Sequence, residues 1–438
     1  MARPAPSVQG EIAPRLTSAP LPSGPPPPGH AGRVGGAMAV LRTAAPRRPA
    51  PGRRRAEPVP SGRAVVVLVL SALAGAAGCA IGPTPGSPPV TGASLAPPVP
   101  MGYVVCPGAV TPVELSSRTP EAPIVLPSTG APSAGGTAIA VAPGGRWAYV
   151  VRSTGGTGGA GATGNEVVPV DLVSQRAGRP IPLPGHGPAR AVVVTPDGRT
   201  VVAASGSALV RVDPVARTVG APLDLGPGRT VAGLARAPSG PTVWALVPGA
   251  VVPVDTATWT AGAPAATGLQ VSSLSSPHGV AVTPDGATVV VVGQGGTDYG
   301  GRLVPVAAAT GAAGPGASFD RFGIAAPAAV AVTPDGARAL VVDSADRWVT
   351  TVPLRPTVGP PATPATPVRL PTARAGQPST GQPSDIVVGP GGPGGGGAYV
   401  VAGFDAVLPY DPATGAFGSP MRVCSGATSM AVAAARRP

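Results

Sequence analysis

The sequence predicts an all-β protein, a seven-bladed β-propeller whose blades are four-stranded antiparallel sheets. Six stretches share one plan of short apolar strands separated by tight turns, and four strands per unit of roughly 40–50 residues is the signature of a propeller blade. The two ends of the chain supply the parts of a seventh blade. The turn prolines recur at positions 143, 196, 238, 284, 334 and 390.

Residues 1–62 are predicted to be a disordered, basic, Pro-rich tail, because they have no apolar periodicity and Pro and Gly interrupt every window. Residues 1–78 carry a net charge of +8, and the rest of the chain carries +4. The Arg runs of the tail lack interleaved aromatics, so we expect no nucleic-acid partner. Met38, or a start nearer Arg63, is an alternative initiation site.

Residues 63–82 are predicted to be a signal or a membrane anchor. Arg63 precedes an apolar run that ends in small residues before Cys79, the pattern of a secretory signal. The end, Leu73-Ala74-Gly75-Ala76-Ala77-Gly78-Cys79, resembles a bacterial lipobox, which implies that Cys79 becomes the lipidated N-terminus of the mature protein. An uncleaved anchor over Ala64–Ile81 and an ordinary signal peptide remain open. All three place the remaining chain outside the cytoplasm, either tethered to the outer face of the cell membrane or secreted.

Residues 83–100 are predicted to be a tether, because their seven prolines favour extended, semi-rigid chain. They would join the membrane segment to a propeller over residues 101–438.

A repeated six-residue turn joins the first two strands of a blade. Val282–Ala287 reads VTPDGA, Val332–Ala337 is identical, and Val194–Arg199 differs in one residue. Proline presets φ in such a turn, Asp bonds the backbone ahead of it, and Gly takes the position with φ > 0. Asp197, Asp285 and Asp335 are therefore interpreted as turn formers.

Each unit then continues to a third strand that carries Val-x-Val or Val-Pro-Val and to a weaker fourth strand. The insert Pro356–Pro383 is predicted to be a long outer loop. The six first strands are expected at Ala138–Val141, Ala191–Val194, Gly233–Ala237, Val280–Val282, Val330–Val332 and Asp385–Val388.

The chain ends are predicted to share one blade. Thr428–Ala434 is a first strand with nothing after it, whereas Gly102–Cys106, Ala109–Leu115 and Pro123–Leu126 provide strands two, three and four. Pairing them closes the ring and removes the open sheet edges that invite aggregation.

Two phrases carry a family resemblance. Pro277–Gly286 reads PHGVAVTPDG, and it resembles, together with Tyr399-Val400-Val401, the YVTN-type β-propeller repeat over about residues 101–434. The resemblance implies a seven-bladed extracytoplasmic propeller, often a surface or periplasmic binding protein. A looser relative is the lactonase-type propeller.

Five residues are candidates for ligand binding. His186 and His278 each lie just before a first strand, Arg190 and Ser384 hold the position equivalent to His278, and Asp385 follows. First strands line the axis of a propeller, so their leading ends ring one mouth of the channel. Such a rim could bind an anion or a metal; alternatively, these are solvated loop residues.

No zinc-type Cys/His spacing, P-loop, Gly-x-Ser-x-Gly elbow or Ser/His/Asp cluster occurs in the sequence, so we assign no catalytic residue, metal site or cofactor. The sequence favours a monomeric binding or scaffold module for a protein, glycan or small molecule. The alternative is a lactonase- or quinoprotein-like enzyme with its site at the channel mouth.

A disulfide between Cys106 and Cys424 is predicted. Of the three cysteines, Cys79 would be used by the lipidation that the lipobox resemblance implies, which leaves two in an oxidising compartment. Cys106 ends the second strand of the closing blade, and Cys424 lies just before its first strand, so their Cα atoms could approach bonding distance.

Overall fold

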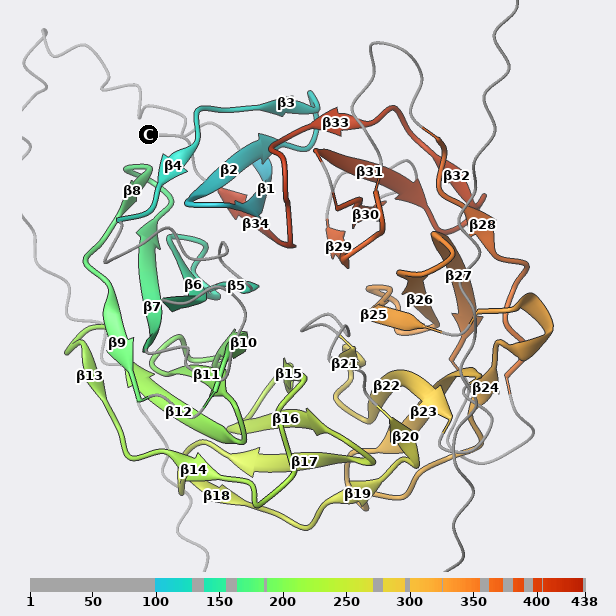
Figure 1. Cartoon of the computed structure of the whole chain (residues 1–438), viewed down its shortest axis with the longest axis horizontal. Helices are drawn as coiled ribbons and strands as arrows, with labels where there is room; N and C mark the ends of the chain where they lie inside the picture. Colours follow the sequence, from blue (N-terminus) through green and yellow to red (C-terminus); the bar gives the residue numbers. More distant parts are fainter. Residues whose placement is uncertain are drawn as a thin grey trace, which may run out of the picture. The chain divides into compact units, whose positions relative to one another are not determined.

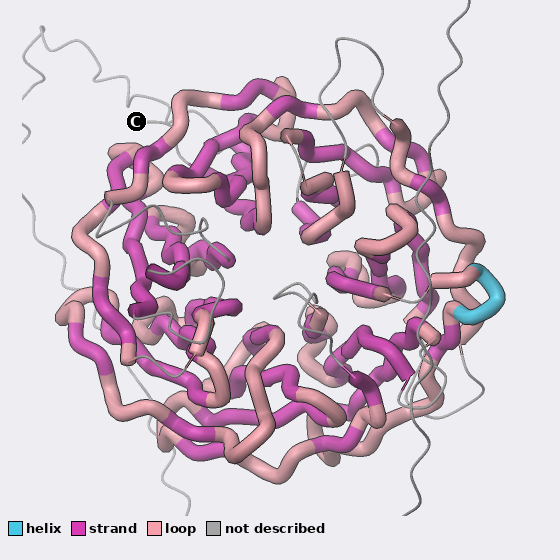
Figure 2. Tube along the Cα trace, viewed as in Figure 1, coloured by secondary structure: helices cyan, strands magenta, loops and turns pink. Residues whose placement is uncertain are grey.

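The computed structural model describes residues 99–127, 138–154, 164–184, 187–270, 279–295, 300–324, 326–354, 362–372, 381–389, 397–403 and 405–435. They form seven small antiparallel sheets in a ring around a central axis, which confirms the predicted seven-bladed propeller (Figure 1). Strands and loops make up almost all of the described chain, with one short 3₁₀ helix at Asp320–Phe322 (Figure 2). The predicted tail and membrane segment lie outside the described residues.

Blades 1 to 6 follow one another along the chain. Blade 1 holds β5 (Ala138–Val141), β6 (Trp147–Thr154), β7 (Gly164–Asp171), β8 (Arg176–Ala177) and β9 (Ile181–Leu183). Blade 2 holds β10 (Ala189–Val194), β11 (Val201–Ser205), β12 (Ala208–Asp213), β13 (Thr218–Val219) and β14 (Leu223–Asp224). Blade 3 holds β15 (Gly233–Arg236), β16 (Thr242–Val247), β17 (Ala250–Asp255), β18 (Thr260–Ala261) and β19 (Ala265–Ala266).

The second half of the ring repeats this order. Blade 4 holds β20 (Leu269–Gln270), β21 (Val280–Val282), β22 (Thr288–Gly295), β23 (Gly301–Ala307) and β24 (Ala317–Ser318). Blade 5 holds β25 (Pro327–Val332), β26 (Arg338–Asp343), β27 (Trp348–Pro353) and β28 (Val368–Arg369). Blade 6 holds β29 (Asp385–Gly389), β30 (Gly397–Val401), β31 (Ala406–Asp411), β32 (Ala416–Phe417) and β33 (Met421–Arg422).

The closing blade combines both ends of the chain, as predicted. It holds β34 (Ser429–Ala435), β1 (Val99–Cys106), β2 (Ala109–Glu114), β3 (Thr119–Pro120) and β4 (Ile124–Val125), in the order β3-β2-β1-β34. Gly102 pairs with Val432 in the antiparallel ladder between β1 and β34. β1 starts at Val99, so the propeller begins two residues inside the predicted tether.

The hydrophobic core lies between blades rather than within one. Along β6, Ala148 and Val150 pack in a cluster with the closing blade, and Tyr149 and Val151 pack in a cluster with blade 2. Successive strand residues point to opposite faces of a sheet, and both faces are buried here. For this reason the strands appear in the sequence as continuous Val-rich runs instead of alternating apolar and polar residues.

The repeated turns have the expected chemistry. The Thr283 hydroxyl donates to the Asp285 carboxylate (2.5 Å) and accepts the N–H of Thr288 (3.0 Å), and Asp285 accepts the N–H of Ala287 (2.9 Å). Gly286 has φ of 73°. The turns at Thr195 and Thr333 repeat these bonds, so all three Asp residues act as turn formers.

The prolines of the third strands sit where no ladder bond is lost. Pro169 in β7 accepts the N–H of Gly178 from the fourth strand (2.7 Å), so its own nitrogen also faces that strand. There the fourth strand is interrupted between β8 and β9. The missing N–H therefore costs no bond to β6, where Tyr149 lies directly opposite Pro169.

Candidate functional site

The two faces of the ring are distinguished by which strand ends lie at each. In blade 2, β10 begins at Ala189 opposite Ser205, the last residue of β11, and ends at Val194 opposite Val201. First strands therefore start, and second strands end, at one face, which we call the mouth face. The Thr-Pro-Asp-Gly turns and the turns between third and fourth strands lie at the opposite face, which we call the turn face.

Of the predicted mouth residues, the structure describes Arg190, Ser384 and Asp385. Arg190 is half-buried in β10, beside a register shift in the ladder with β11. Ser384 lies just before β29, on the far side of the central axis from β10 (Figure 1). Its hydroxyl lies 3.5 Å from the carbonyl oxygen of Ala427. His186 and His278 lie outside the described residues.

Asp385 is completely buried, with no solvent-exposed surface. One carboxylate oxygen accepts the N–H of Ile386 (2.7 Å), and the other accepts the N–H of Met430 in β34 (2.9 Å). The carboxylate thus ties blade 6 to the last strand of the chain. In this arrangement it is not presented to the channel.

Other buried polar groups at the mouth face also hold blades together. The side-chain amide of Asn165 donates to the carbonyl of Gly187 (2.6 Å) and to the Ser205 hydroxyl (2.7 Å), and it accepts the N–H of Ala189 (3.2 Å). Arg152 forms a buried ion pair with Glu166 inside blade 1, and its guanidinium also donates to the carbonyl of Pro127, which follows β4 of the closing blade. These groups were not anticipated, because strand patterns do not show which polar residue fills a contact between blades.

Asp343, at the end of β26, is a buried carboxylate that bonds to backbone within blade 5. It accepts the N–H of Ala326 (2.8 Å) and of Asp346 (2.7 Å). Burial raises the pKa of this carboxyl, and the backbone donors oppose that shift.

The predicted disulfide between Cys106 and Cys424 is present, with Cα atoms 6.0 Å apart. It joins the end of the second strand to the segment that leads into the first strand of the same blade. Blade 2 makes this link with a hydrogen bond from Ser205 to the carbonyl of Pro184 (3.0 Å), and blade 5 makes it through Asp343 and Ala326. The disulfide thus replaces, in the closing blade, the hydrogen bond that links the same two segments in blades 2 and 5.

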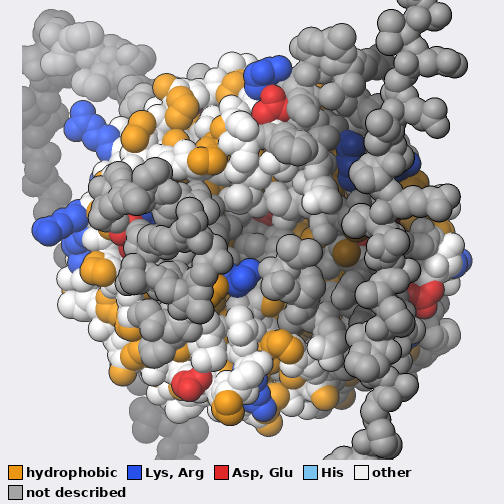
Figure 3. All heavy atoms as spheres, in the orientation of Figure 1, with side chains coloured by type: hydrophobic (Ala, Val, Ile, Leu, Met, Phe, Trp, Pro, Cys, Tyr) orange, Lys and Arg blue, Asp and Glu red, His pale blue; other side chains and the backbone are white. Residues whose placement is uncertain are grey.

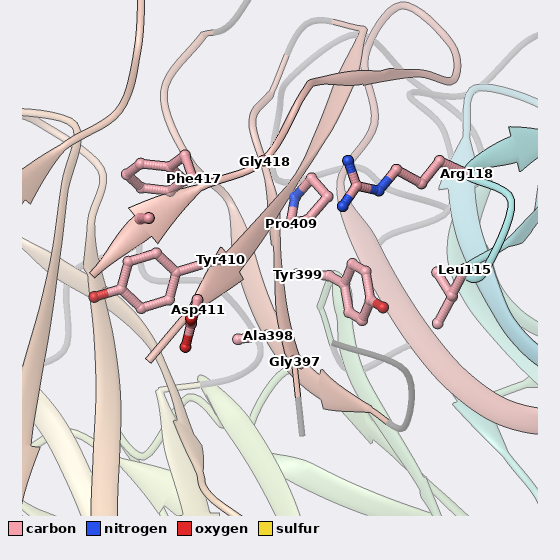
Figure 4. Close-up of a pocket in the computed structure, with 11 residues that line it drawn as sticks. Leu115, Arg118, Gly397, Ala398, Tyr399, Pro409, Tyr410, Asp411, Phe417 and Gly418 are labelled. Atoms are coloured by element: carbon pink, nitrogen blue, oxygen red, sulfur yellow. The ribbon is translucent and has the colours of Figure 1, made fainter. Parts of the chain in front are cut away.

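A pocket of about 170 Å³ lies at the turn face, between blade 6 and the closing blade. Leu115 and Arg118 approach from the closing blade, and Tyr399 and Pro409 from blade 6, whereas the Phe417 ring points the other way and packs on Tyr410 (Figure 4). Its position follows from strand register, since β30 begins and β31 ends at this face.

The pocket has apolar walls and two charged side chains. Arg118 is exposed, and its positive charge opposes the effect of burial, which raises the pKa of the Tyr399 hydroxyl. Asp411 accepts the N–H of Ala413 (2.8 Å) and the Thr414 hydroxyl (2.8 Å), and these bonds lower the pKa of its carboxyl. The sequence offers one weak sign of this site, a turn of the closing blade that ends in Arg118.

The described residues contain no group of three or more His, Cys, Asp or Glu side chains that could hold a metal ion. Nor does that part of the chain contain a helix long and apolar enough to cross a membrane. Figure 3 shows charged side chains scattered singly and in pairs over the face in view.

No family model matches the chain, and neither does any curated protein sequence. Solved structures do match its fold. The periplasmic gluconolactonase PpgL of Pseudomonas aeruginosa superposes with a TM-score of 0.56 at 16% identity, over 77% of this chain and 99% of that one. A functionally unknown protein from Desulfotomaculum acetoxidans DSM 771 gives 0.54 at 12%, over 76% and 99%. Hydrazine synthase from Kuenenia stuttgartiensis gives 0.53 at 16%, over 68% and 89%. Identities this low show a shared fold alone.

Proposed function

We propose that the protein is an extracytoplasmic, membrane-tethered binding propeller that holds a small ligand between blade 6 and the closing blade. The pocket at Arg118 is the observation that carries this proposal. It combines apolar walls with few polar groups, as small-molecule sites do, and its about 170 Å³ suits a small ligand. The mouth residues His186, Arg190 and His278 remain a second candidate surface for the same function.

A thermal-shift screen of the full chain against small metabolites tests the pocket. A ligand that binds only the folded state raises the melting temperature with concentration. Ala416 lines the pocket and is exposed, so Ala416→Trp should fill the site and abolish the shift. Ala413→Trp, an exposed neighbour outside the lining, is the matched control. A shift that persists in Ala416→Trp would place the ligand elsewhere.

The enzyme alternative is tested by lactone hydrolysis, since one structural neighbour is a gluconolactonase. A binding module should show no turnover above that of buffer. Hydrolysis that falls when Arg190→Gln is introduced at the mouth would contradict the binding proposal and favour an enzyme.

The tether is proposed from the sequence, with lipidated Cys79 as its anchor. Mass spectrometry of the mature N-terminus should find a diacyl or triacyl cysteine, and Cys79→Ala should move the propeller from the membrane fraction to the soluble fraction. Finding residues 1–78 still attached would refute the lipoprotein form.

A further inference from the structure

We propose that the pocket at the turn face binds a small carboxylate with an apolar body, and that Arg118 holds the carboxylate. This inference rests on the proposed function and names the ligand class of its site. It follows from a contact that blades 1, 2 and 3 each make with the blade before them and that Arg118 of the closing blade does not make.

In blades 1 to 3 the turn between third and fourth strands ends in a residue with left-handed backbone whose side chain reaches the preceding blade, whereas blades 4 and 6 have Gly311 and Gly415 at this position. The φ values are 52° at Gln175, 58° at Arg217 and 56° at Trp259. Each of these side chains donates a hydrogen bond to the fourth-strand segment before it. The acceptors are Glu121 Oε2 (2.5 Å) for Gln175, the carbonyl of Arg179 (2.5 Å) for Arg217 and the carbonyl of Ala221 (2.9 Å) for Trp259.

Arg118 has the same turn position but makes no such bond. Its φ is 61°. Its guanidinium lies over the fourth strand of blade 6, because Nη1 is 3.5 Å from the point where a Cβ on Gly418 would stand. Within the described chain it forms no hydrogen bond or ion pair. The guanidinium instead borders the pocket beside Pro409 (Figure 4). A planar carboxylate accepts two parallel N–H bonds from such a fork.

The walls define the rest of the ligand. Leu115, the Tyr399 ring and Pro409 are the apolar surfaces on the side of Arg118 (Figure 4), and the small volume limits the body to about one ring or a short acyl chain. Asp411 disfavours a second carboxylate, because it stays ionised and its oxygens already cap their own turn. Asp171, Asp213 and Asp255 cap the equivalent turns of blades 1 to 3, so this role belongs to the fold.

Titration calorimetry of the full chain with three matched probes tests the ligand class. Phenylacetate should bind, phenylacetamide should bind at least about tenfold more weakly, and phenethylamine should not bind. Arg118→Gln should weaken phenylacetate roughly ten- to a hundredfold, since a charge-assisted bond is lost, and should leave phenylacetamide unchanged. Arg118→Lys should recover part of the loss.

Arg217→Gln is the matched control, because it removes a guanidinium at the same turn position whose bond to Arg179 is already made. It should leave phenylacetate binding unchanged. If all three probes bind equally and Arg118→Gln has no effect, while Ala416→Trp abolishes binding, the carboxylate inference fails and the pocket function stands. If no probe binds and the metabolite screen gives no shift dependent on Ala416, both fail.

Discussion

A threonine and an aspartate two residues later stabilise three of the propeller's turns through hydrogen bonds. The pKa values of Asp197, Asp285 and Asp335 are lowered, first by the hydrogen bond from the preceding threonine and then by a backbone N–H. In blade 3, Ala237 and Ser239 replace this pair, yet the hairpin still forms with Gly240 at φ of 75°. The glycine and the strand pairing therefore suffice for the turn, and the Thr–Asp pair adds a charge-dependent contribution.

Acid should weaken these turns. A carboxylate whose pKa is lower in the folded state than the unfolded value of about 3.9 binds fewer protons when folded. Its stabilisation is full above the unfolded value and is lost as pH falls through the folded pKa. The melting temperature should therefore fall between about pH 5 and about pH 3. A triple variant, Thr195→Val, Thr283→Val and Thr333→Val, should melt lower at neutral pH and lose less on acidification.

Thr230→Val, an exposed threonine outside these turns, is the control and should follow the wild type. Equal slopes with pH in the triple variant and the wild type would show that the threonine bonds do not set the acid response.

The strand is the scale at which sequence reasoning works best here. Val-Pro-Val would normally argue against a central strand, because proline breaks the ladder. At Pro169 and Pro253 the proline faces a gap in the fourth strand, and Gly178 and Gly262 donate to the proline carbonyls across it. Because Val-Pro-Val recurs at the same place in several units, it can be assigned to the third strand; an isolated Val-Pro-Val could not be distinguished from a turn.

The functional residues were less predictable than the strands. The sequence indicates that first strands begin at one mouth, but it does not show that the Asp385 carboxylate bonds to the backbone of β34. The pocket was missed because it depends on Arg118 meeting blade 6, a contact between distant parts of the chain. Repeats reveal strand order, whereas side-chain partners across a blade junction depend on packing that one sequence does not display.

At the scale of the whole molecule, the ring is closed inside one blade, the closing blade. There β1 pairs with β34, and the Cys106–Cys424 disulfide reinforces that closure, because the two cysteines lie 318 positions apart in the chain. A bond across so long a loop restricts the unfolded chain strongly. The other six blades need no such bond, because each is built from one stretch of the chain.

Removing the disulfide should therefore cost more than removing a hydrogen bond at the equivalent place. Replacing both Cys106 and Cys424 by Ser should lower the free energy of unfolding by up to about 5 kcal/mol. Ser205→Ala, which removes the corresponding bond to Pro184 and also the acceptor of the buried Asn165 amide, should cost about 1–3 kcal/mol. Denaturant unfolding of the two variants and the wild type measures both costs. Reductant should lower the unfolding midpoint of the wild type, and a midpoint that does not respond would contradict the expectation.

The disulfide also changes how the chain is connected. From Cys106 to Cys424 the backbone and the sulfur bridge together form a covalent circle, with the two remaining ends of the chain as branches. A single cut by a protease anywhere between these cysteines opens the circle but releases no fragment. In an environment that contains proteases, a nicked propeller would remain one molecule and could keep its blades paired.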